Sequence, residues 1–502
     1  MYNFSEKLPP RHPVQTPEYD CALNSRRLSE VFARCSDFHL REIEPGLDGG
    51  GSVRVAWVDG LVSGDEVAEA VLRPLTERRR AGDLSPEACC AQLMRGGVYA
   101  LSATVRDTMD DLVQDLTHGN CALIFDELQQ ALCFELRSTS VRSVSEPTLE
   151  KSLKGAKDSF VEALRTNTSL VRQRLATPKL KLLESSIGRK SSTQVALLYL
   201  DGVADPAKVE ELARRLDSID VDALLATGVL EEAVSDAPRS PFPQVLHTER
   251  PDRFAMYLSD GRIGLLIHGL PVGLVVPATF SEFMKVTGDR STNFIISSGL
   301  SVLRYFALLL GMLLPAVYVA MAMYHQEMIP TRLLLSMIEA KQHVPFSTAL
   351  EVLGMLVAFT LLQEAGLRLP TPIGDTVSII GALIVGQSAV EARVVSPIAI
   401  IVVAVAGIAC YTLPSQDMAS AVRLSCFLSL LFAVAAGLFG VGVFCCLLLL
   451  HLASIDSYGI SYTAPLSDSL PHGLFRVLFR RPERERKVRD PLLNTPDKRR
   501  QS

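Results

Sequence analysis

Long apolar runs separate the C-terminal part of the chain from a polar N-terminal half. Three runs carry no Asp, Glu, Lys or Arg, namely Tyr305–Tyr324, Val394–Leu413 and Cys426–Leu450. A helix needs about 20 apolar residues to cross the hydrocarbon core of a bilayer, and each run reaches that length. The pattern therefore predicts three membrane-spanning helices, within a transmembrane helix bundle over residues 301–455.

Two further segments of this region have a mixed pattern. Ile373–Val390 is long enough to cross and is predicted as a fourth span, although Gln387 and Ser388 lie inside it. Pro345–Gly366 is amphipathic and contains Glu351 and Glu364. Such a segment can be re-entrant, interfacial or a tilted span, and the sequence leaves these alternatives open.

The two ends of the chain constrain the number of spans. The tail after Ile455 is rich in Arg and Lys, and positive charge is concentrated in cytoplasmic segments. The N-terminal half begins without the basic-then-apolar pattern of a signal peptide, so we expect it on the same side. Two ends on one side require an even number of spans. Four is favoured, with Pro345–Gly366 not crossing and Arg393 in a cytoplasmic turn.

The polar half shows two passages with the same order of predicted elements. In the first, a strand ends at Asp59-Gly60, a helix follows, a second helix covers Thr104–Thr117, and a strand pair turns near Glu127–Gln130. In the second, the strand ends at Asp201-Gly202 and the next helix begins after Asp205.

These two passages keep one register. The two Asp-Gly pairs are 142 residues apart, and Gly119 and Gly261 have the same spacing. Glycine is favoured where a strand or helix passes into a turn with unusual dihedral angles. The fold prediction is an α/β cytoplasmic domain of two similar lobes, formed by internal duplication, followed by an all-α multi-span membrane domain. Two unrelated α/β segments with common turn residues are the alternative.

The same pattern sets the expected domain boundaries. They are a flexible N-terminal arm (1–40), the first α/β lobe (41–140), a basic helical connector (141–192), the second α/β lobe (193–280), a neck (281–300), the bundle (301–455) and a basic cytoplasmic tail (456–502).

Two sets of polar residues are candidate functional residues. A connector helix over Lys157–Leu175 carries arginines that are either a solvated face or a contact with lipid headgroups or an acidic partner. The arginines expected at contacts between domains are Arg172, Arg174, Arg250 and Arg253. In the membrane, polar groups face protein or water. Gln387, Ser388 and Glu391 are therefore candidates for an ion or solute path, or for hydrogen bonds between helices.

Small residues and one proline complete the candidate list. Gly381 and Gly386 permit close approach of helices, and Pro315 lies inside an apolar run. We expect these three positions to serve packing or gating.

Composition argues against several other classes of function. The net charge of −5 and the absence of a basic–aromatic stripe in the polar half give no indication of nucleic-acid binding. The ten cysteines include no CxxC pair and are expected to be reduced thiols. No cofactor or metal motif and no catalytic arrangement is recognisable, so a non-enzymatic protein is expected.

Several ordered runs resemble the GerA family of spore germination proteins. They are KGAKDSFVEALRTNTSLVRQRLATPKLK (Lys154–Lys181), IGRKSSTQVALLYLDGVADP (Ile187–Pro206), SPFPQVLHTERPDR (Ser240–Arg253), VPATF (Val276–Phe280), LLPAVY (Leu313–Tyr318), GLRLPTPIG (Gly366–Gly374), GALIVGQSAVEARVVSP (Gly381–Pro397) and HLASIDSYGISYTAPL (His451–Leu466). The resemblance covers residues 145–466, and the first lobe more loosely. It does not separate a germinant receptor A subunit from the sporulation-stage paralogue of the family.

The resemblance implies a place in the inner membrane of the bacterial spore. Such proteins work with a transporter-like B subunit and a lipoprotein C subunit in response to small nutrients. A-type subunits are thought to form homo-oligomers in the lipid bilayer that conduct ions once nutrient is sensed. The expected function is thus a receptor subunit that couples nutrient sensing to ion release. The alternatives are the paralogue, assisting ion or dipicolinate release, and a secondary transporter.

Overall fold

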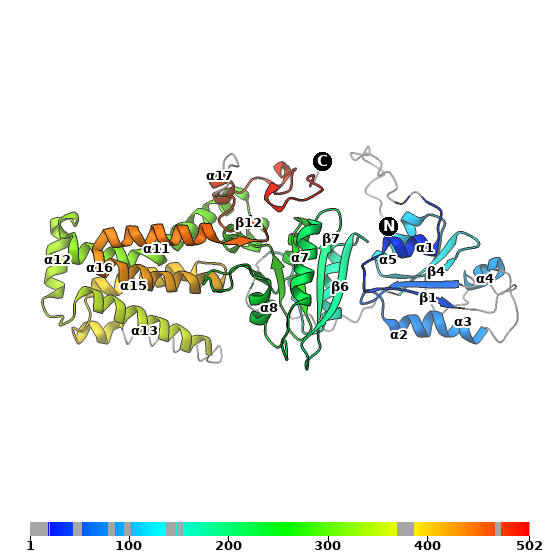
Figure 1. Ribbon diagram of the computed structural model, residues 1–502, viewed down its shortest axis with the longest axis horizontal. Coiled ribbons are helices and arrows are strands. Elements are labelled where there is room, and N and C mark those ends of the chain that lie inside the picture. Colours follow the sequence, from blue (N-terminus) through cyan, green and yellow to red (C-terminus); the bar gives the residue numbers. More distant parts are fainter. Residues whose placement is uncertain are drawn as a thin grey trace. The chain divides into compact units, whose positions relative to one another are not determined.

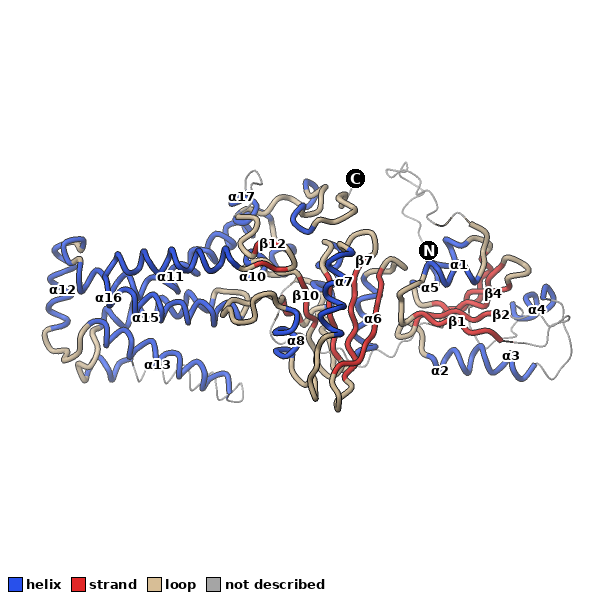
Figure 2. The backbone as a smooth tube through the Cα atoms, in the orientation of Figure 1, coloured by secondary structure: helices blue, strands red, loops and turns tan. Residues whose placement is uncertain are grey.

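The computed structural model describes residues 19, 21–43, 53–78, 86–94, 102–136, 147, 150, 154–368, 386–466 and 473–500. The chain forms two compact units. One comprises Met1–Val234, His247–Val276 and Lys487–Ser502, and the other comprises Ser235–Leu246 and Pro277–Arg486. The first unit contains two five-stranded sheets and the second is mainly helical (Figures 1 and 2). This arrangement confirms an α/β region followed by a helical one.

The first sheet has the strand order β1-β2-β4-β5-β3. Its strands are β1 (Phe38–Ile43), β2 (Val53–Val58), β3 (Ala103–Arg106), β4 (Asn120–Phe125) and β5 (Gln130–Glu135). Helices α1 (Ser25–Val31) and α5 (Met109–Thr117) cover one face. The other face is covered by α2 (Gly64–Val67), which continues through a π-helical turn (Ala68–Leu72) into α3 (Arg73–Arg78), and by α4 (Pro86–Gln92).

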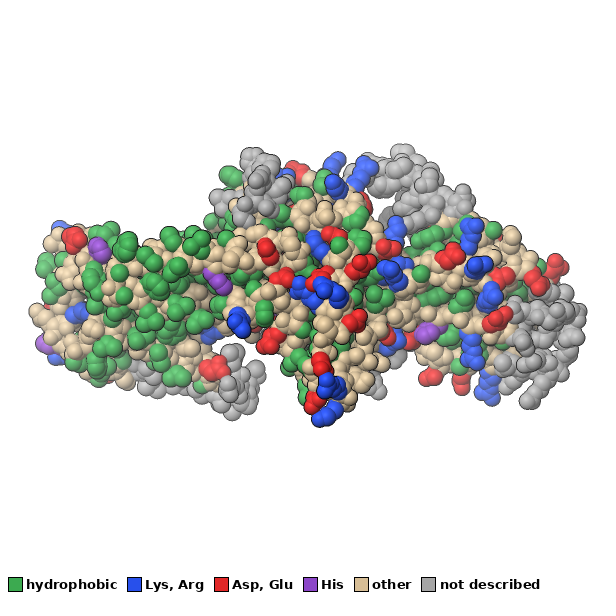
Figure 3. Space-filling view, viewed as in Figure 1, with side chains coloured by type: hydrophobic (Ala, Val, Ile, Leu, Met, Phe, Trp, Pro, Cys, Tyr) green, Lys and Arg blue, Asp and Glu red, His purple; other side chains and the backbone are tan. Residues whose placement is uncertain are grey.

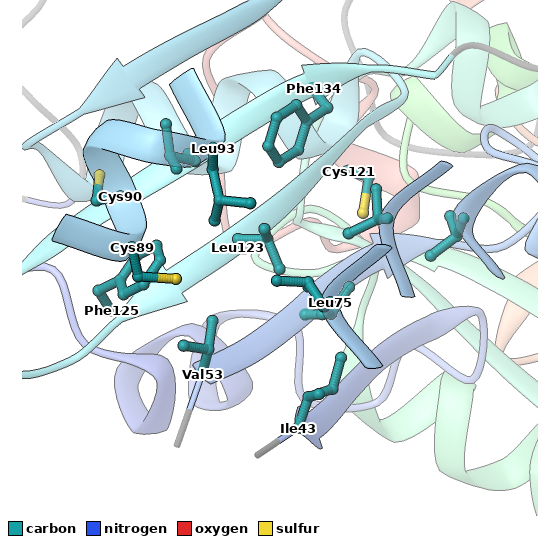
Figure 4. Packing of buried hydrophobic residues seen from close by; sticks show 14 of the residues in the cluster. Ile43, Val53, Leu75, Cys89, Cys90, Leu93, Cys121, Leu123, Phe125 and Phe134 are labelled. Atoms are coloured by element: carbon teal, nitrogen blue, oxygen red, sulfur yellow. The ribbon is translucent and has the colours of Figure 1, made fainter. Parts of the chain in front are cut away.

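Alternation along these strands builds a core on each face of the sheet. In β4, Leu123 points to the α2–α4 side and Ala122 to the α1–α5 side, as the two-residue period of a strand requires. Figure 4 shows the α2–α4 core, where Leu75 and Leu93 approach the strands with Cys121 and Phe134 beside them.

The second sheet repeats the strand order of the first, as β6-β7-β9-β10-β8. Its strands are β6 (Leu180–Ile187), β7 (Thr193–Leu200), β8 (Leu246–Thr248), β9 (Ile263–Ile267) and β10 (Gly273–Val276), and its helices are α6 (Leu164–Arg174), α7 (Pro206–Asp217), α8 (Thr227–Val234) and α9 (Pro251–Ser259). Gly60, Gly119, Gly202 and Gly261 all have positive φ, between +75° and +100°. The four glycines that define the sequence register thus stand where their lack of a Cβ matters.

Some element boundaries differ from the predicted ones. Thr104–Thr117 is not one helix, because Ala103–Arg106 pairs with β5 and the helix begins only after Thr108, whose side chain caps it. The arm predicted to reach residue 40 contains α1 and the first half of β1, which pairs along β2. The connector helix is shorter than predicted, and residues 180–187 of the connector are the edge strand β6.

The basic tail is also not one free segment. Residues 487–500 pack on the second sheet's helices within the first unit. Lys208 of α7 donates to the Leu493 carbonyl (2.9 Å), and Arg500 pairs with Asp260 at 2.7 Å. Leu493 is buried, so this part of the tail is held by packing as well as by charge.

The second unit contains the predicted membrane region. It begins with α10 (Phe280–Phe283) and a 3-10 turn (Thr287–Ser291). Its long helices are α11 (Phe294–Tyr324), α12 (Thr331–Lys341), α13 (Thr348–Arg368), α15 (Pro397–Tyr411) and α16 (Gln416–Ser454), and the strand pair β11 (Asp456–Ser457) and β12 (Ile460–Ser461) and the helix α17 (Gly473–Leu478) follow. Hydrophobic side chains cover most of its visible surface, whereas charged side chains gather over the sheets (Figure 3).

Three helices among the described residues are long and apolar enough to cross a membrane. They are α11, α13 over Thr348–Gly366, and α16, and the shorter α15 is also apolar. The predicted span Tyr305–Tyr324 lies within α11, and the predicted span Val394–Leu413 contains the shorter α15. The α13 segment, which our count excluded, qualifies by length and composition. Most of the predicted span Ile373–Val390 lies outside the described residues, where only 386–390 are seen, as part of a short helical stretch.

The helix α16 is two helices joined at a sharp reversal. Ala436 and Gly437 have non-helical dihedral angles, with φ +58° at Gly437. The rings of Phe432 and Phe444 lie 5.9 Å apart, although twelve residues of straight helix would separate them by about 18 Å. The prediction of one span over Cys426–Leu450 is therefore wrong, since a uniformly apolar run has the same composition whether it continues or folds back.

The reversal shows which helix ends meet. Tyr324, the last residue of α11, donates from its hydroxyl to the Val434 carbonyl beside the turn (2.5 Å). Ser396, just before α15, donates to Glu351 in the first turn of α13. These contacts lie at the α11 C-terminal end of the bundle. The turn at Arg393 is at this end too, not at the end where α11 begins as the four-span count required.

Candidate functional site

A buried carboxylate lies at the α11 C-terminal end of the bundle. The Glu351 side chain has no exposed surface, and its Oε2 accepts from the Ser396 hydroxyl at 2.9 Å and from the Ser396 N–H at 3.4 Å. The Lys341 ammonium is 3.5 Å from Oε1, and it also donates to Thr348. Because Oε1 has no hydrogen-bond partner in the described structure, the cluster retains one buried acceptor position.

The local sequence explains this arrangement. Ser396 is the N-cap of α15, and its hydroxyl accepts from the Ala399 N–H while donating to Glu351. Pro397 follows at the first helical position, where its missing N–H is not needed. The cap of one helix is thereby tied to the first turn of another, which fixes α15 against α13.

A second polar contact lies further along α13. Gln363 accepts from the Arg423 guanidinium of α16 at 2.8 Å and is almost fully buried. A pocket opens beside this pair, lined mainly by Leu356, Phe359, Thr360, Gly407, Cys410 and Phe427. Glu351 and Gln363 are separated by about 18 Å along the helix axis. Ionisable groups inside a membrane bundle are costly and mark functional positions by default.

The predicted path residues lie at the same end as Glu351 but on the surface. Gln387, Ser388 and Glu391 belong to the helical stretch 386–391 and are exposed. Ala389 between them packs in the core that also contains Val352 and Val395. The stretch is thus anchored by one side, while its polar groups face away from the bundle core.

The predicted packing positions have mixed outcomes. Pro315 is buried inside α11. A Cβ on Gly386 would meet open space, so that glycine allows no close contact among the described residues, and Gly381 lies outside them. Close approach occurs elsewhere, since a Cβ on Gly407 would lie 2.4 Å from the Phe359 ring and one on Gly440 would lie 2.0 Å from the Phe432 carbonyl oxygen.

The predicted arginines are paired rather than solvated. Arg172 makes a bidentate contact with Asp37, with distances of 2.5 and 2.7 Å, and both side chains are at most 2% exposed. Asp37 precedes β1 of the first sheet, and Arg172 lies in the last turn of α6, which packs on the second sheet. This pair therefore joins the two lobes. The solvated-face interpretation is therefore wrong for Arg172, whose partner is 135 residues away in the chain.

The other three arginines pair with partners in the connector or in the second lobe. Arg174 contacts Asp158, and the buried Arg250 makes two bonds to Asp252, at 3.0 and 2.7 Å. Arg253 contacts Glu150, which also accepts from Thr248 (2.6 Å). The contacts with Glu150 connect Thr248 of β8 and Arg253 of α9 to the chain before α6.

Sequence reasoning missed Ser396, Gln363 and Arg423, and noted Glu351 only as a sign of amphipathicity. The sequence contained a usable signal for Arg423 and for Glu351. Arg423 stands three residues before a long apolar run, and Glu351 stands inside one. A charge in such a position indicates a buried partner. The identity of each partner required the fold.

These features define a membrane protein with a polar region of two α/β lobes. Each lobe contains a five-stranded sheet, and the two sheets have the same strand order. The family model described as Bacillus/Clostridium GerA spore germination protein matches residues 26–492. The chain belongs to the GerA family of spore germination proteins.

Individual relatives cover most of the chain. It is 35% identical over 445 residues to the uncharacterized membrane protein YfkQ of Bacillus subtilis strain 168, with 88% of this chain and 85% of the relative covered. It is 33% identical over 461 residues to spore germination protein KA of the same strain, with 92% and 84% covered. A solved N-terminal domain of the A subunit of the Bacillus megaterium spore germinant receptor GerK3 is 28% identical, with 51% of this chain and 93% of that chain covered and a TM-score of 0.40.

Proposed function

We propose that this protein is a membrane subunit of a spore germinant receptor that couples nutrient sensing to ion release, as an oligomeric ion-conducting channel. Family membership and the names of the relatives support the receptor part of this proposal. The transporter-like B subunit and the lipoprotein C subunit are the proposed partners. The inner membrane of the spore is the proposed location, with both chain ends cytoplasmic.

One observation carries the conducting role. Gln387, Ser388 and Glu391 are exposed at the end of an apolar bundle where the buried Glu351 also lies. Exposed polar groups on such a bundle suit a water-filled path formed between several copies. A carboxylate near its mouth would attract cations.

The bundle also supports a revised span count. The reversal makes α16 two crossings, and α13 adds a third to those of α11 and α15, which gives five. With the segment before Glu391 as a further span, the total is six. Six is even and keeps both ends of the chain on one side, as the positive tail requires. The shared strand order of the two sheets, with its four glycines in register, supports internal duplication of the α/β lobe.

The proposed path is tested by ion flux. The protein with its proposed partners is reconstituted in liposomes, and monovalent cation release is followed with a fluorescent dye after nutrient addition. We expect E391A and Q387L each to reduce the release rate at least about fivefold, because the path loses a charge or a polar group. E351Q is expected to reduce it as well.

The matched control is E339Q, an exposed glutamate on α12 outside the proposed path. It should leave the release rate unchanged. If E391A and Q387L also leave the rate unchanged while the complexes assemble normally, these residues do not line the conducting path. A complex that releases no ions in any form would contradict the channel proposal itself.

A further inference from the structure

A short helix after the bundle and the residue that follows it expose two stacked aromatic side chains. Phe475 lies in α17 and is 61% exposed, and Phe479 directly follows the last residue of α17 and is 47% exposed. Their rings lie 5.6 Å apart and nearly parallel, at 25°, whereas Val477 on the opposite side is buried. One side of α17 therefore faces the protein and the other presents a continuous aromatic surface.

This helix is attached to the beginning of α11. The Arg480 N–H donates to the Ser298 hydroxyl at 2.9 Å, and its guanidinium contacts the Asp289 carbonyl oxygen. Asp289 in turn makes a bidentate pair with Arg304 (2.6 and 2.7 Å). Hydrogen bonds from Arg480 to Ser298 of α11 and to Asp289 before α11 thus fix the position of α17 relative to the first predicted span.

The first turns of α11 are apolar and exposed as well. With 31 residues, α11 is about 46 Å long, which exceeds the roughly 30 Å of a hydrocarbon core. The Arg304–Asp289 ion pair, whose side chains are 11% and 12% exposed, marks a level at which charge is tolerated. Ile295, Ile296 and Leu303 precede it and are 53–66% exposed. They make the beginning of α11, to which α17 is attached, an exposed apolar surface as well.

A positively charged segment follows α17 in the chain. Between Arg480 and Arg489 the chain has six basic and two acidic side chains, and Arg481, Arg484 and Lys487 are exposed. Aromatic side chains insert at the boundary between headgroups and acyl chains, while Lys and Arg attract anionic lipids. A protein partner would need an apolar patch rimmed by acid, whereas an anionic bilayer surface offers both properties beside a helix that already enters it.

We propose that α17, together with the first turns of α11, lies on the surface of an anionic phospholipid bilayer. Phe475 and Phe479 insert at the level of the headgroups, and the arginines that follow contact lipid phosphates. This contact holds the junction between the bundle and the tail at the membrane surface. It is independent of whether the bundle conducts ions.

Quenching by brominated lipids tests the proposal. Trp57 is the sole tryptophan, so the full-length variants W57F/F475W and W57F/F479W each carry one reporter at the proposed surface. They are placed in nanodiscs with brominated acyl chains, made either of phosphatidylcholine alone or of phosphatidylcholine and phosphatidylglycerol in equal parts. The matched control is W57F/L225W, a reporter at a position of the second lobe that is 76% exposed.

We expect brominated lipid to quench both α17 reporters at least about twice as strongly as the control, and more strongly with the anionic lipid. Adding R481E/R484E should remove the extra effect of the anionic lipid. Quenching of both α17 reporters no stronger than that of L225W would overturn the proposal. So would efficient disulfide crosslinking of F475C between two copies in the same nanodisc, which would assign the surface to a contact between subunits.

Discussion

Single buried charges connect distant parts of this chain. Arg172 and Asp37 are 135 residues apart and nearly inaccessible to solvent. A buried ion pair contributes little net stability compared with an apolar pair, but removing one partner leaves an uncompensated charge. Such a pair therefore specifies which surfaces of the two lobes meet.

The variant R172M should strongly destabilise the protein. Asp37 would remain buried without its partner, so we expect a loss of about 3–5 kcal/mol in the free energy of unfolding. Urea unfolding of the full chain in detergent, followed by Trp57 fluorescence, measures this, because Trp57 lies in β2. The control R189M removes an exposed pair with Asp220 and should cost less than about 1 kcal/mol. Equal losses in the two variants would contradict a special role of the buried pair.

Burial also determines thiol chemistry in the first lobe. Burial raises the pKa of the Cys121 thiol to about 12, so at pH 8 only about one molecule in 10⁴ carries the reactive thiolate. We expect iodoacetamide to modify the partly exposed Cys21 at least about 100 times faster than Cys121 in the native protein. Mass spectrometry of the peptides measures both rates, and unfolding in urea should make them similar. Equal rates in the native state would show that the core is open.

At the scale of elements, the hairpin within α16 depends on small residues. Its two helices approach closely at Gly440, where a side chain would collide with the backbone of Phe432.

A second glycine allows the C-terminal residues 487–500 to pack against the second lobe. A Cβ on Gly261 would lie 2.5 Å from the Thr495 side chain, so a larger residue in this turn would displace the tail.

The variant G440A tests the hairpin. The added methyl group must displace backbone, and overpacking of this kind costs about 1–3 kcal/mol. We expect a clear fall in the melting temperature of the detergent-solubilised protein, measured by loss of the monodisperse peak in size-exclusion chromatography after heating. G442A is the control, since a Cβ there meets no atom within 4 Å. A continuous helix would tolerate both substitutions equally.

At the scale of the whole molecule, the path of the chain through the bundle distinguishes six spans from four. Six spans place Arg393 on the side opposite the basic tail and Gln416 on the same side as the tail. Four spans, as the apolar runs alone suggest, reverse both positions. Both residues are exposed.

Cysteine labelling of intact cells provides the test. In a background carrying C445S and C446S, we expect a membrane-impermeant maleimide to label R393C directly. It should label Q416C only after the membrane is permeabilised. The opposite result would restore the four-span arrangement. A variant with cysteine in place of Lys498, in the tail, serves as the internal-side control.

Much of the fold of the polar region could be predicted because its signals are local. Asp205 caps α7 through its own side chain, with Pro206 at the first helical position. Strands β4 and β5 follow from two short apolar runs on either side of one turn. The exception was Ala103–Arg106, whose four residues continue the apolar spacing of the next helix and become a strand only by pairing with β5.

The sequence by itself determined the division into a polar α/β region and an apolar helical one, the glycine turns and the family. These depend on composition and on neighbours a few residues apart. Tertiary structure alone decided the partner of Arg172, the contact of Glu351 with Ser396 and the reversal at Gly437. Each of these depends on which surfaces come together across long stretches of chain. The order of apolar and polar residues along the sequence is the same whether a charge is buried or exposed, and whether an apolar run continues as one helix or folds back.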